Sequence, residues 1–320
     1  MSVPKRCNRC ILPNSCDLIP FDSDGTCKLC KAVQTEDPPL QPTTAPVISL
    51  EEHIDRIRQK GKGRKYDCVV GVSGGRDSTY LLSLLVNRHQ LRCLAVYYRT
   101  PFTSETIDTN IRRIVSRLGV DFEEIQLSQE YHKKVARKMV LLWKKKAHRL
   151  IINLACAPCK LLNREMYKIA RKHKAPTIIY GTNIYEAVQI APGISKKQTV
   201  VRGGAQVASV SRKIKSMFSL IASGAKLLIE FPVLVRYLWL GFKSSIMYIS
   251  PRTLYLSLRY PGIKTFNYFY DGRWDEADCE KTLNELGWQR PPGCNTSWKA
   301  DCSFDEIKNK MLHQTIGITY

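Results

Sequence analysis

The chain has little acidic charge and no long uninterrupted hydrophobic run. Its 50 Lys and Arg outnumber 28 Asp and Glu, which leaves a net charge of +22 and a field that attracts nucleotides, nucleic acids or an anionic membrane surface. No secretory signal is expected, because no apolar stretch follows Met1. The most hydrophobic segment, 218–242, contains Lys226, Glu230 and Arg236, and these charges disfavour a spanning helix. We expect a cytoplasmic protein whose segment 218–242 can dock on a membrane surface.

Without an export signal, the 12 cysteines favour metal or redox chemistry over a disulfide framework. Cys7 and Cys10 form a Cys-x-x-Cys pair, and sixteen residues later Cys27 and Cys30 form another. This spacing is typical of a structural zinc site, and bound Zn²⁺ would fold so small a module. A rubredoxin-like iron site and four unrelated thiols are the alternatives.

Composition divides the chain of 320 residues into four parts. A zinc module (1–34) precedes a proline-rich linker and surface helix (35–60), in which Ser49 and Glu52 have capping-box spacing. An α/β domain (61–200) and a mostly helical cap or substrate region (201–320) follow. We also expect a homo-oligomer.

Short apolar runs alternate with amphipathic stretches in the α/β part. The expected strands are 68–72, 92–98, 122–127 and 177–180. Strand–helix alternation predicts a doubly wound parallel sheet covered on both faces, with ligands at the carboxyl ends of the strands.

The loop Ser73-Gly74-Gly75-Arg76-Asp77-Ser78 lies between the first of these strands and a helix that begins near Thr79. The glycines let the main chain approach an anion closely, and the N–H groups at a helix start face it. The serines add hydroxyl donors, and Arg76 adds positive charge. The chain has no Gly-x-x-x-x-Gly-Lys-Ser/Thr string, so this is a different kind of phosphate loop. The alternative is a turn that merely joins strand to helix.

This hexapeptide resembles the Ser-Gly-Gly-x-Asp-Ser signature of the PP-loop ATP pyrophosphatases. The resemblance implies an enzyme that uses ATP to adenylate a substrate oxygen, releasing pyrophosphate, before a nucleophile displaces AMP. Asp77 would help to place Mg²⁺, and we expect Asp77 and Ser78 to be catalytic. The ATP-binding residues would be Ser73, Gly74, Gly75, Arg76, Asp77, Ser78, Tyr97 at the end of the second strand, and Gly181 and Asn183 after the fourth.

A third Cys-x-x-Cys pair, Cys156 and Cys159, opens a basic amphipathic segment. A helix N-terminus lowers a thiol pKa and suits thiolates that react or bind metal. A third ligand would have to be Cys279, Cys294 or Cys302, and ordinary free thiols are the alternative reading.

A closer resemblance is to the N-acetyl sugar amidotransferase family of surface-polysaccharide biosynthesis. The resemblance rests on four segments: the cysteine pairs of 7–30, the Ser73–Ser78 loop, Cys156 to Cys159, and the tail 297–302, Ser-Trp-Lys-Ala-Asp-Cys. The resemblance implies that a carbonyl or amide oxygen of a sugar nucleotide is replaced by nitrogen. Separate glutaminase subunits would supply the ammonia, since the chain shows no glutaminase domain.

The cysteines also resemble those of the PP-loop tRNA thiolases, which replace the adenylated oxygen with sulfur. In that resemblance Cys156, Cys159 and Cys302 would hold a [4Fe-4S] cluster with one open iron, and a second zinc site is the competing interpretation. We expect these residues to be catalytic or metal-binding.

The segment 194–264 departs from the amidotransferase family. Basic residues there are interleaved with aromatics, a pattern suited to RNA, to a nucleotide-sugar base or to anionic lipid, although a helical cap over the active site is the plainer interpretation. The alternative to an enzyme is a binding protein: a basic zinc-containing protein that binds RNA or a protein partner.

Overall fold

The computed structural model describes residues 8, 22–26, 49–125, 127–181, 228–237, 258–271, 275–292 and 302–316. Several predicted site residues lie outside these ranges: Cys7, Cys10, Cys27, Cys30 and Asn183. The zinc module and the role of Asn183 therefore stay predictions. A turn lies before Cys27: Gly25 has a φ of +76°, and its amide donates to the Asp22 carbonyl over 3.0 Å.

Within the described residues, five parallel strands form one sheet with the order β3-β2-β1-β4-β5. The strands are β1 (Cys68–Val72), β2 (Cys93–Tyr98), β3 (Asp121–Ile125), β4 (Thr177–Tyr180) and β5 (Lys264–Asn267). The chain runs outward from β1 to β3 and then returns to the other side of β1. This order confirms the predicted doubly wound α/β fold.

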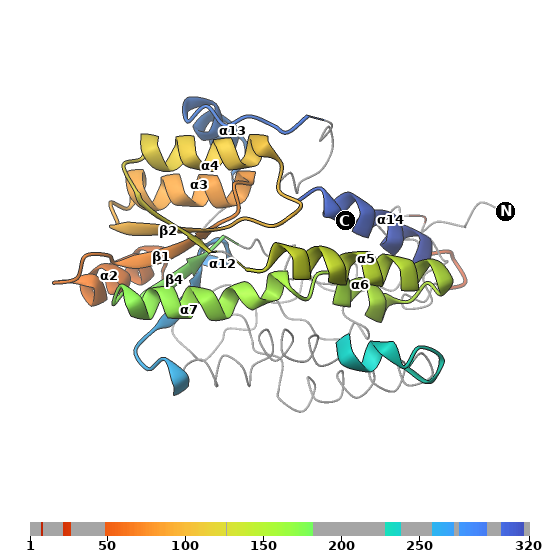
Figure 1. Cartoon of the computed structure of the whole chain (residues 1–320). Coiled ribbons are helices and arrows are strands. Elements are labelled where there is room, and N and C mark those ends of the chain that lie inside the picture. The colour runs from red at the N-terminus through yellow and green to blue at the C-terminus, as the bar shows by residue number, and fades with distance from the viewer. Residues whose placement is uncertain are drawn as a thin grey trace.

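Helices cover both faces of the sheet (Figure 1). The described helices are α2 (Leu50–Gly61), α3 (Arg76–Ser83) with the π-helical turn η1 (Leu84–Arg88), α4 (Glu105–Arg117), α5 (Gln129–Lys145), α6 (Arg149–Ala155), the 3₁₀ turn η2 (Cys159–Leu161), α7 (Leu162–Lys172), α12 (Tyr268–Asp271), α13 (Glu276–Glu285) and α14 (Phe304–Ile316). In Figure 1, α3, α4 and α13 lie on one side of the strands and α7 on the other.

Alternating side chains of the central strands enter two separate cores. Val70 and Tyr97 pack with α3 and α4, whereas Val69 and Tyr98 pack toward α7. Because successive side chains of a strand point to opposite faces, a strand covered on both sides is apolar throughout. That is why the sequence placed these strands to within a residue or two.

The sheet also takes a strand from the region that the sequence assigned to a separate helical part, 201–320. Ile178 and Ile179 of β4 pair with Thr265 and Phe266 of β5, and α13 packs on α3. The strand β5 escaped prediction because it is short and its side chains are exposed or half-buried, so it has no apolar run. The α/β unit thus includes residues far beyond 200.

A smaller core lies beyond the carboxyl ends of the strands. Val135 and Met139 of α5, Ile151 of α6 and Phe304 of α14 are buried together. Figure 1 shows α5, α6 and α14 side by side to the right of the sheet. Among the described helices, none is long and apolar enough to cross a membrane.

Candidate active site at the carboxyl edge of the sheet

The Ser73–Ser78 loop connects β1 to α3, as the sequence predicts, and its two serines hold it closed. The Ser73 amide donates to Ser78 Oγ over 3.1 Å, and the two hydroxyl oxygens lie 3.1 Å apart. The Gly75 amide donates to Ser73 Oγ over 3.3 Å, and Ser78 Oγ donates to the Gly75 carbonyl over 3.2 Å. The loop therefore has a defined shape.

Gly74 is the position where this loop needs glycine. Its φ is +80°, and a Cβ there would lie 2.6 Å from Ile107 Cγ2 and 3.1 Å from the Ile107 carbonyl oxygen. The Gly74 carbonyl accepts a hydrogen bond of 2.9 Å from Trp288 Nε1. An L side chain at this position would be strained and would also clash.

The helix that follows begins without a side-chain cap. Gly75 is the N-cap of α3 and supplies no capping side chain, so the first-turn N–H groups and the helix dipole face outward from the loop. Asp77 and Ser78 lie in this first turn and are half-buried. Uncapped amides beside hydroxyl donors fit phosphate oxygens, and a carboxylate oxygen is the kind of ligand that Mg²⁺ prefers.

Arg76 does not stand as an isolated charge in the loop. Its Nη1 lies 2.6 Å from Glu276 Oε1, and the arginine side chain is only 11% exposed. Next to it, the Tyr80 hydroxyl donates to Asp278 over 2.6 Å. Helix α13 thus holds α3 by two polar contacts and offsets the positive charge that Arg76 was expected to offer to phosphate.

A segment after α13 completes this support. Gln289 and Asn110 of α4 exchange hydrogen bonds of 2.6 and 3.0 Å, and Arg113 Nη1 donates to the Gly287 carbonyl over 2.7 Å. These contacts position Trp288 over Gly74. Sequence reasoning missed Trp288 and Asn110, because no motif surrounds them and their partners are far away in the chain.

Two other expected nucleotide contacts have packing roles in the structure. Tyr97 is fully buried, and its ring stacks on Phe122 with centroids 6.1 Å apart, so it presents no exposed face to adenine. Gly181 follows β4 as expected, and a Cβ there would lie 3.0 Å from Leu81 Cδ2. Gly181 therefore allows β4 to end close against α3.

The cysteine pair of 156–159 lies near Tyr98 at the end of β2, on the other face of the sheet. His132 of α5 connects them: its Nε2 is 3.5 Å from Cys159 Sγ and its Nδ1 is 3.4 Å from the Tyr98 hydroxyl. Burial lowers the pKa of His132 to about 4, so the ring is neutral near pH 7. A neutral imidazole donates through one nitrogen and accepts through the other, which matches one hydroxyl and one thiol.

Cys302 reaches the same place from the distant C-terminal region. Burial, followed by the charges of Cys159 and Cys302, raises the pKa of Tyr98. The chain next to Cys302 is fixed there, since the Ser303 amide donates to the Phe102 carbonyl over 3.0 Å. The structure thus gathers two predicted thiols, and Cys156 packs against the same small core as Cys302.

These thiols do not form a ready ligand set. Across the part of the chain that the structure describes, no three His, Cys, Asp or Glu side chains are placed to hold a metal ion. Cys279, one expected third ligand, is buried in the core on the opposite face, where burial raises its pKa to about 12. The [4Fe-4S] cluster or second zinc ion expected at Cys156, Cys159 and Cys302 therefore stays a prediction.

No family model matches the sequence, and no curated protein matches it significantly. Several solved structures are distantly similar, and three of them are described here. NMN synthetase from Francisella tularensis is 17% identical with a TM-score of 0.29, and the match covers 42% of this chain and 55% of that one. The chain therefore spans about half the length of that synthetase.

U34-tRNA thiolase NcsA from Methanococcus maripaludis, solved with its [4Fe-4S] cluster, is 12% identical with a TM-score of 0.37, covering 98% of this chain and 83% of that one. The NH3-dependent NAD synthetase from Campylobacter jejuni, solved with a nitrate ion, is 13% identical with a TM-score of 0.32, covering 62% and 94%. These values are too low for us to infer function from them.

Proposed function

We propose that the protein is a PP-loop ATP pyrophosphatase that adenylates a carbonyl or amide oxygen of an N-acetyl sugar nucleotide and replaces this oxygen with nitrogen. The observation that carries the ATP-dependent step is the shape of the Ser73–Ser78 loop: Gly74 has a positive φ, Ser73 and Ser78 are hydrogen-bonded to each other, and the helix that follows has no side-chain cap. The sugar nucleotide and the nitrogen rest on the motif resemblance alone.

In the proposed reaction the substrate oxygen attacks the α-phosphorus of ATP, and the bond from that phosphorus to the bridging oxygen of pyrophosphate breaks. Ammonia then adds to the activated carbon, and the original oxygen leaves with AMP. Ser73, Gly74, Gly75 and Ser78 hold the departing pyrophosphate through main-chain and hydroxyl donors. Arg76 adds charge that its ion pair with Glu276 reduces. Mg²⁺ near Asp77 would neutralise the phosphate charge when bound.

The remaining parts of the proposal concern partners and location. Separate glutaminase subunits would supply ammonia, and the enzyme would work as a homo-oligomer in the cytoplasm, with the region around 218–242 able to rest on an anionic membrane. Liposome sedimentation tests the last point: protein that stays wholly in the supernatant would remove membrane docking from the proposal.

The test of the ATP-dependent step is pyrophosphate release in Asp77→Ala. We expect substrate-dependent release to fall by about a thousandfold or more, since a group that organises transition-state charge is removed. Asp55→Ala is the matched control, because Asp55 is an exposed aspartate of α2 that pairs with Arg58. Both variants should melt close to the wild-type temperature. Full turnover by a folded Asp77→Ala would remove the loop from the mechanism. Salt-sensitive RNA binding by a wild-type protein that cleaves no ATP would instead favour a basic RNA-binding protein.

A second candidate, favoured by the thiols around His132, replaces the oxygen with sulfur. Cys159 Sγ lies 3.5 Å from His132 Nε2, and Cys302, from a distant part of the chain, packs against the same small core as Cys156. Iron, acid-labile sulfide and zinc should be measured on anaerobically purified protein and on Cys156→Ala and Cys302→Ala. About four irons and four sulfides per chain that vanish in both variants would make sulfur transfer the leading function. Protein that contains zinc but no iron or sulfide would favour replacement of the oxygen by nitrogen from ammonia.

A further inference from the structure

A cavity lies at the amino-terminal ends of the strands, where α7 ends and β4 begins. Its volume is about 440 Å³, and its lining includes Arg64 from the chain before β1, Arg171 and Lys174 from the end of α7, and Arg259 and Tyr260 from the segment before β5. The cavity is separated from the Ser73 loop by the length of β1, roughly 16 Å for its five residues. It is therefore distinct from the proposed ATP site.

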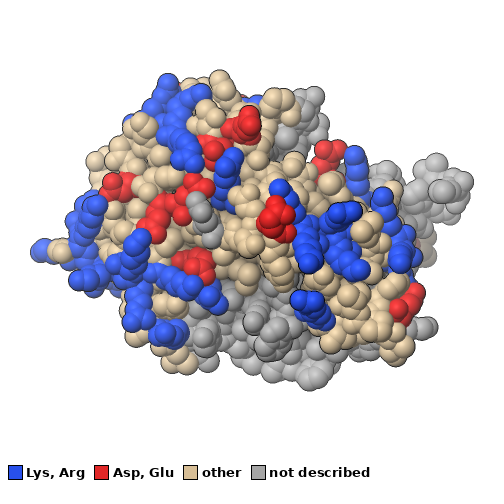
Figure 2. All heavy atoms as spheres, viewed as in Figure 1, with Lys and Arg blue, Asp and Glu red and all other residues tan. Residues whose placement is uncertain are grey.

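This cavity is lined by positive charge without compensation. Four of its lining residues are Arg or Lys, and none is Asp or Glu. Nearby cations of the same edge are paired: Lys65 with Asp121, Arg92 with Asp67 and Lys172 with Glu123. Among the described residues, no carboxylate pairs with Arg64, Arg171, Lys174 or Arg259. Figure 2 shows Lys and Arg gathered over this left-hand end of the molecule.

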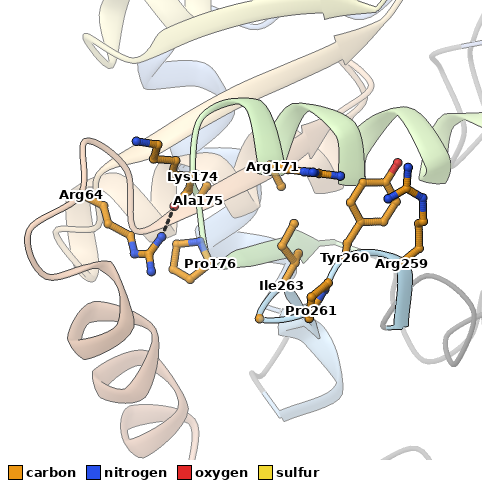
Figure 3. A pocket seen from close by; sticks show the side chains of 11 residues that line it. Arg64, Arg171, Lys174, Ala175, Pro176, Arg259, Tyr260, Pro261 and Ile263 are labelled. Atoms are coloured by element: carbon orange, nitrogen blue, oxygen red, sulfur yellow. Dashed lines mark hydrogen bonds between the residues drawn. The ribbon is translucent and has the colours of Figure 1, made fainter.

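Three of these exposed guanidinium groups make contacts with the described chain. Arg64 Nη1 donates to the Lys174 carbonyl over 2.7 Å, which fixes one end of the cavity. At the other end, the guanidinium carbons of Arg171 and Arg259 lie 6.0 and 5.7 Å from the ring centroid of Tyr260 (Figure 3). Tyr260 is itself buried and packs on Tyr167. Two guanidinium groups that share one ring repel each other, and an anion between them would relieve the repulsion.

We propose that this cavity is a binding site for the phosphate group of an anionic ligand, separate from the proposed ATP site and additional to the proposed function. Arginine favours phosphate because its planar fork donates two parallel hydrogen bonds to two oxygens. The volume exceeds that of one phosphate and admits pyrophosphate or a nucleoside monophosphate. A free phosphate compound and a phosphate of a nucleic-acid backbone present the same chemistry to these residues.

The experiment compares two double variants of equal charge. Arg171→Gln with Arg259→Gln removes the two guanidinium groups beside Tyr260, and Lys134→Gln with Arg137→Gln removes two exposed cations of α5 as the control. Inorganic pyrophosphate is titrated calorimetrically into each protein and into wild type at low salt, and a labelled RNA 20-mer is titrated in parallel. We expect the cavity variant to lose one class of pyrophosphate sites, weakened at least tenfold, and the control to stay within about twofold.

The other outcomes are equally decisive. If only RNA binding weakens tenfold relative to the control, the phosphate comes from a nucleic-acid backbone and the site stands. If neither titration distinguishes the cavity variant from the control, the proposal is overturned. Arg171→Lys with Arg259→Lys keeps the charge should the glutamine variant unfold; unchanged affinity for both probes in a folded lysine variant and in a single Arg259→Gln variant would also overturn it. Substrate-dependent pyrophosphate release at saturating ATP should be unchanged in the cavity variants, so this result is independent of the test of Asp77.

Discussion

The two edges of the parallel sheet treat charge in opposite ways. At the carboxyl edge, main-chain hydrogen bonds and close packing shape the Ser73–Ser78 loop, and Arg76 is paired with Glu276. At the amino edge, four cations line a cavity that has no carboxylate in its wall. Hydrogen bonds and close packing therefore define the site at the carboxyl edge, and positive charge defines the cavity at the amino edge.

This difference has consequences for what each edge tolerates. A loop shaped by hydrogen bonds of 2.9 to 3.3 Å should fail when a single methyl group is added or a single hydrogen bond is lost, and it should be insensitive to salt. A cavity organised by charge should tolerate small changes of shape and respond to ionic strength. Substitutions at each edge can test this contrast.

The largest effect is expected for Gly74→Ala. The new methyl group would meet Ile107 in a backbone with φ of +80°, so we expect a loss of about 2–4 kcal/mol in the free energy of unfolding together with loss of pyrophosphate release. Gly63→Ala is a matched control, because Gly63 has a φ of +75° but nothing within 4 Å of the added Cβ. It should lose only about 1 kcal/mol. Equal losses in urea denaturation would contradict the packing argument.

A smaller effect is expected for Trp288→Phe, which keeps most of the ring and removes the hydrogen bond to the Gly74 carbonyl. We expect about 1 kcal/mol less stability and a KM for ATP raised about threefold to tenfold. Trp143→Phe removes a similar bond of 2.8 Å, from Trp143 Nε1 to Thr315 Oγ1 between α5 and α14. This control should lose similar stability with no change in KM. A shared rise in KM would show that Trp288 acts through general stability.

The smallest effect is expected at the amino edge, for Glu123→Gln. Burial alone would raise the pKa of Glu123, but hydrogen bonds from Lys172 and His173 outweigh it and hold the pKa below its usual value of 4.5. The stabilisation is therefore present above the unfolded pKa and is lost as pH falls through the lower folded pKa. We expect about 0.5 kcal/mol less stability at pH 6 and no difference from wild type near pH 2. Glu130→Gln, whose carboxylate is exposed beside Lys133, should lose less stability at pH 6 than Glu123→Gln. An equal loss would contradict the role given to the partly buried pair of Glu123.

The sequence predicted the parts of this molecule that are local. Strands β1 and β4 have the predicted bounds, and the Ser49 hydroxyl accepts from the Glu52 amide over 3.1 Å, as its spacing indicated. The loop was recognisable because its glycines and serines are contiguous. These features need only a short window of chain.

The missed parts depend on distant pairing. Lys264–Asn267 is the outermost strand of the sheet, and half of its side chains are exposed, so no hydrophobic period marks it. The contacts of Trp288 with Gly74 and of Glu276 with Arg76 could not be predicted from the sequence, because the partners are far apart in the chain and neither Trp288 nor Glu276 lies in a motif. Tyr97 was expected to face a ligand because it ends a strand, but the pleat turns its ring into the core.

The hydrogen bond between Trp288 and Gly74 joins residues 214 positions apart. On a ribosome that adds about 5–20 residues per second, the loop would leave the exit tunnel roughly 10–40 s before its partner does. During the part of that interval between the emergence of β4 and that of β5, β4 has no β5 beside it and offers an open edge to other chains. A nascent chain of this protein is therefore most exposed to aggregation late in its synthesis, and chaperones would matter most then.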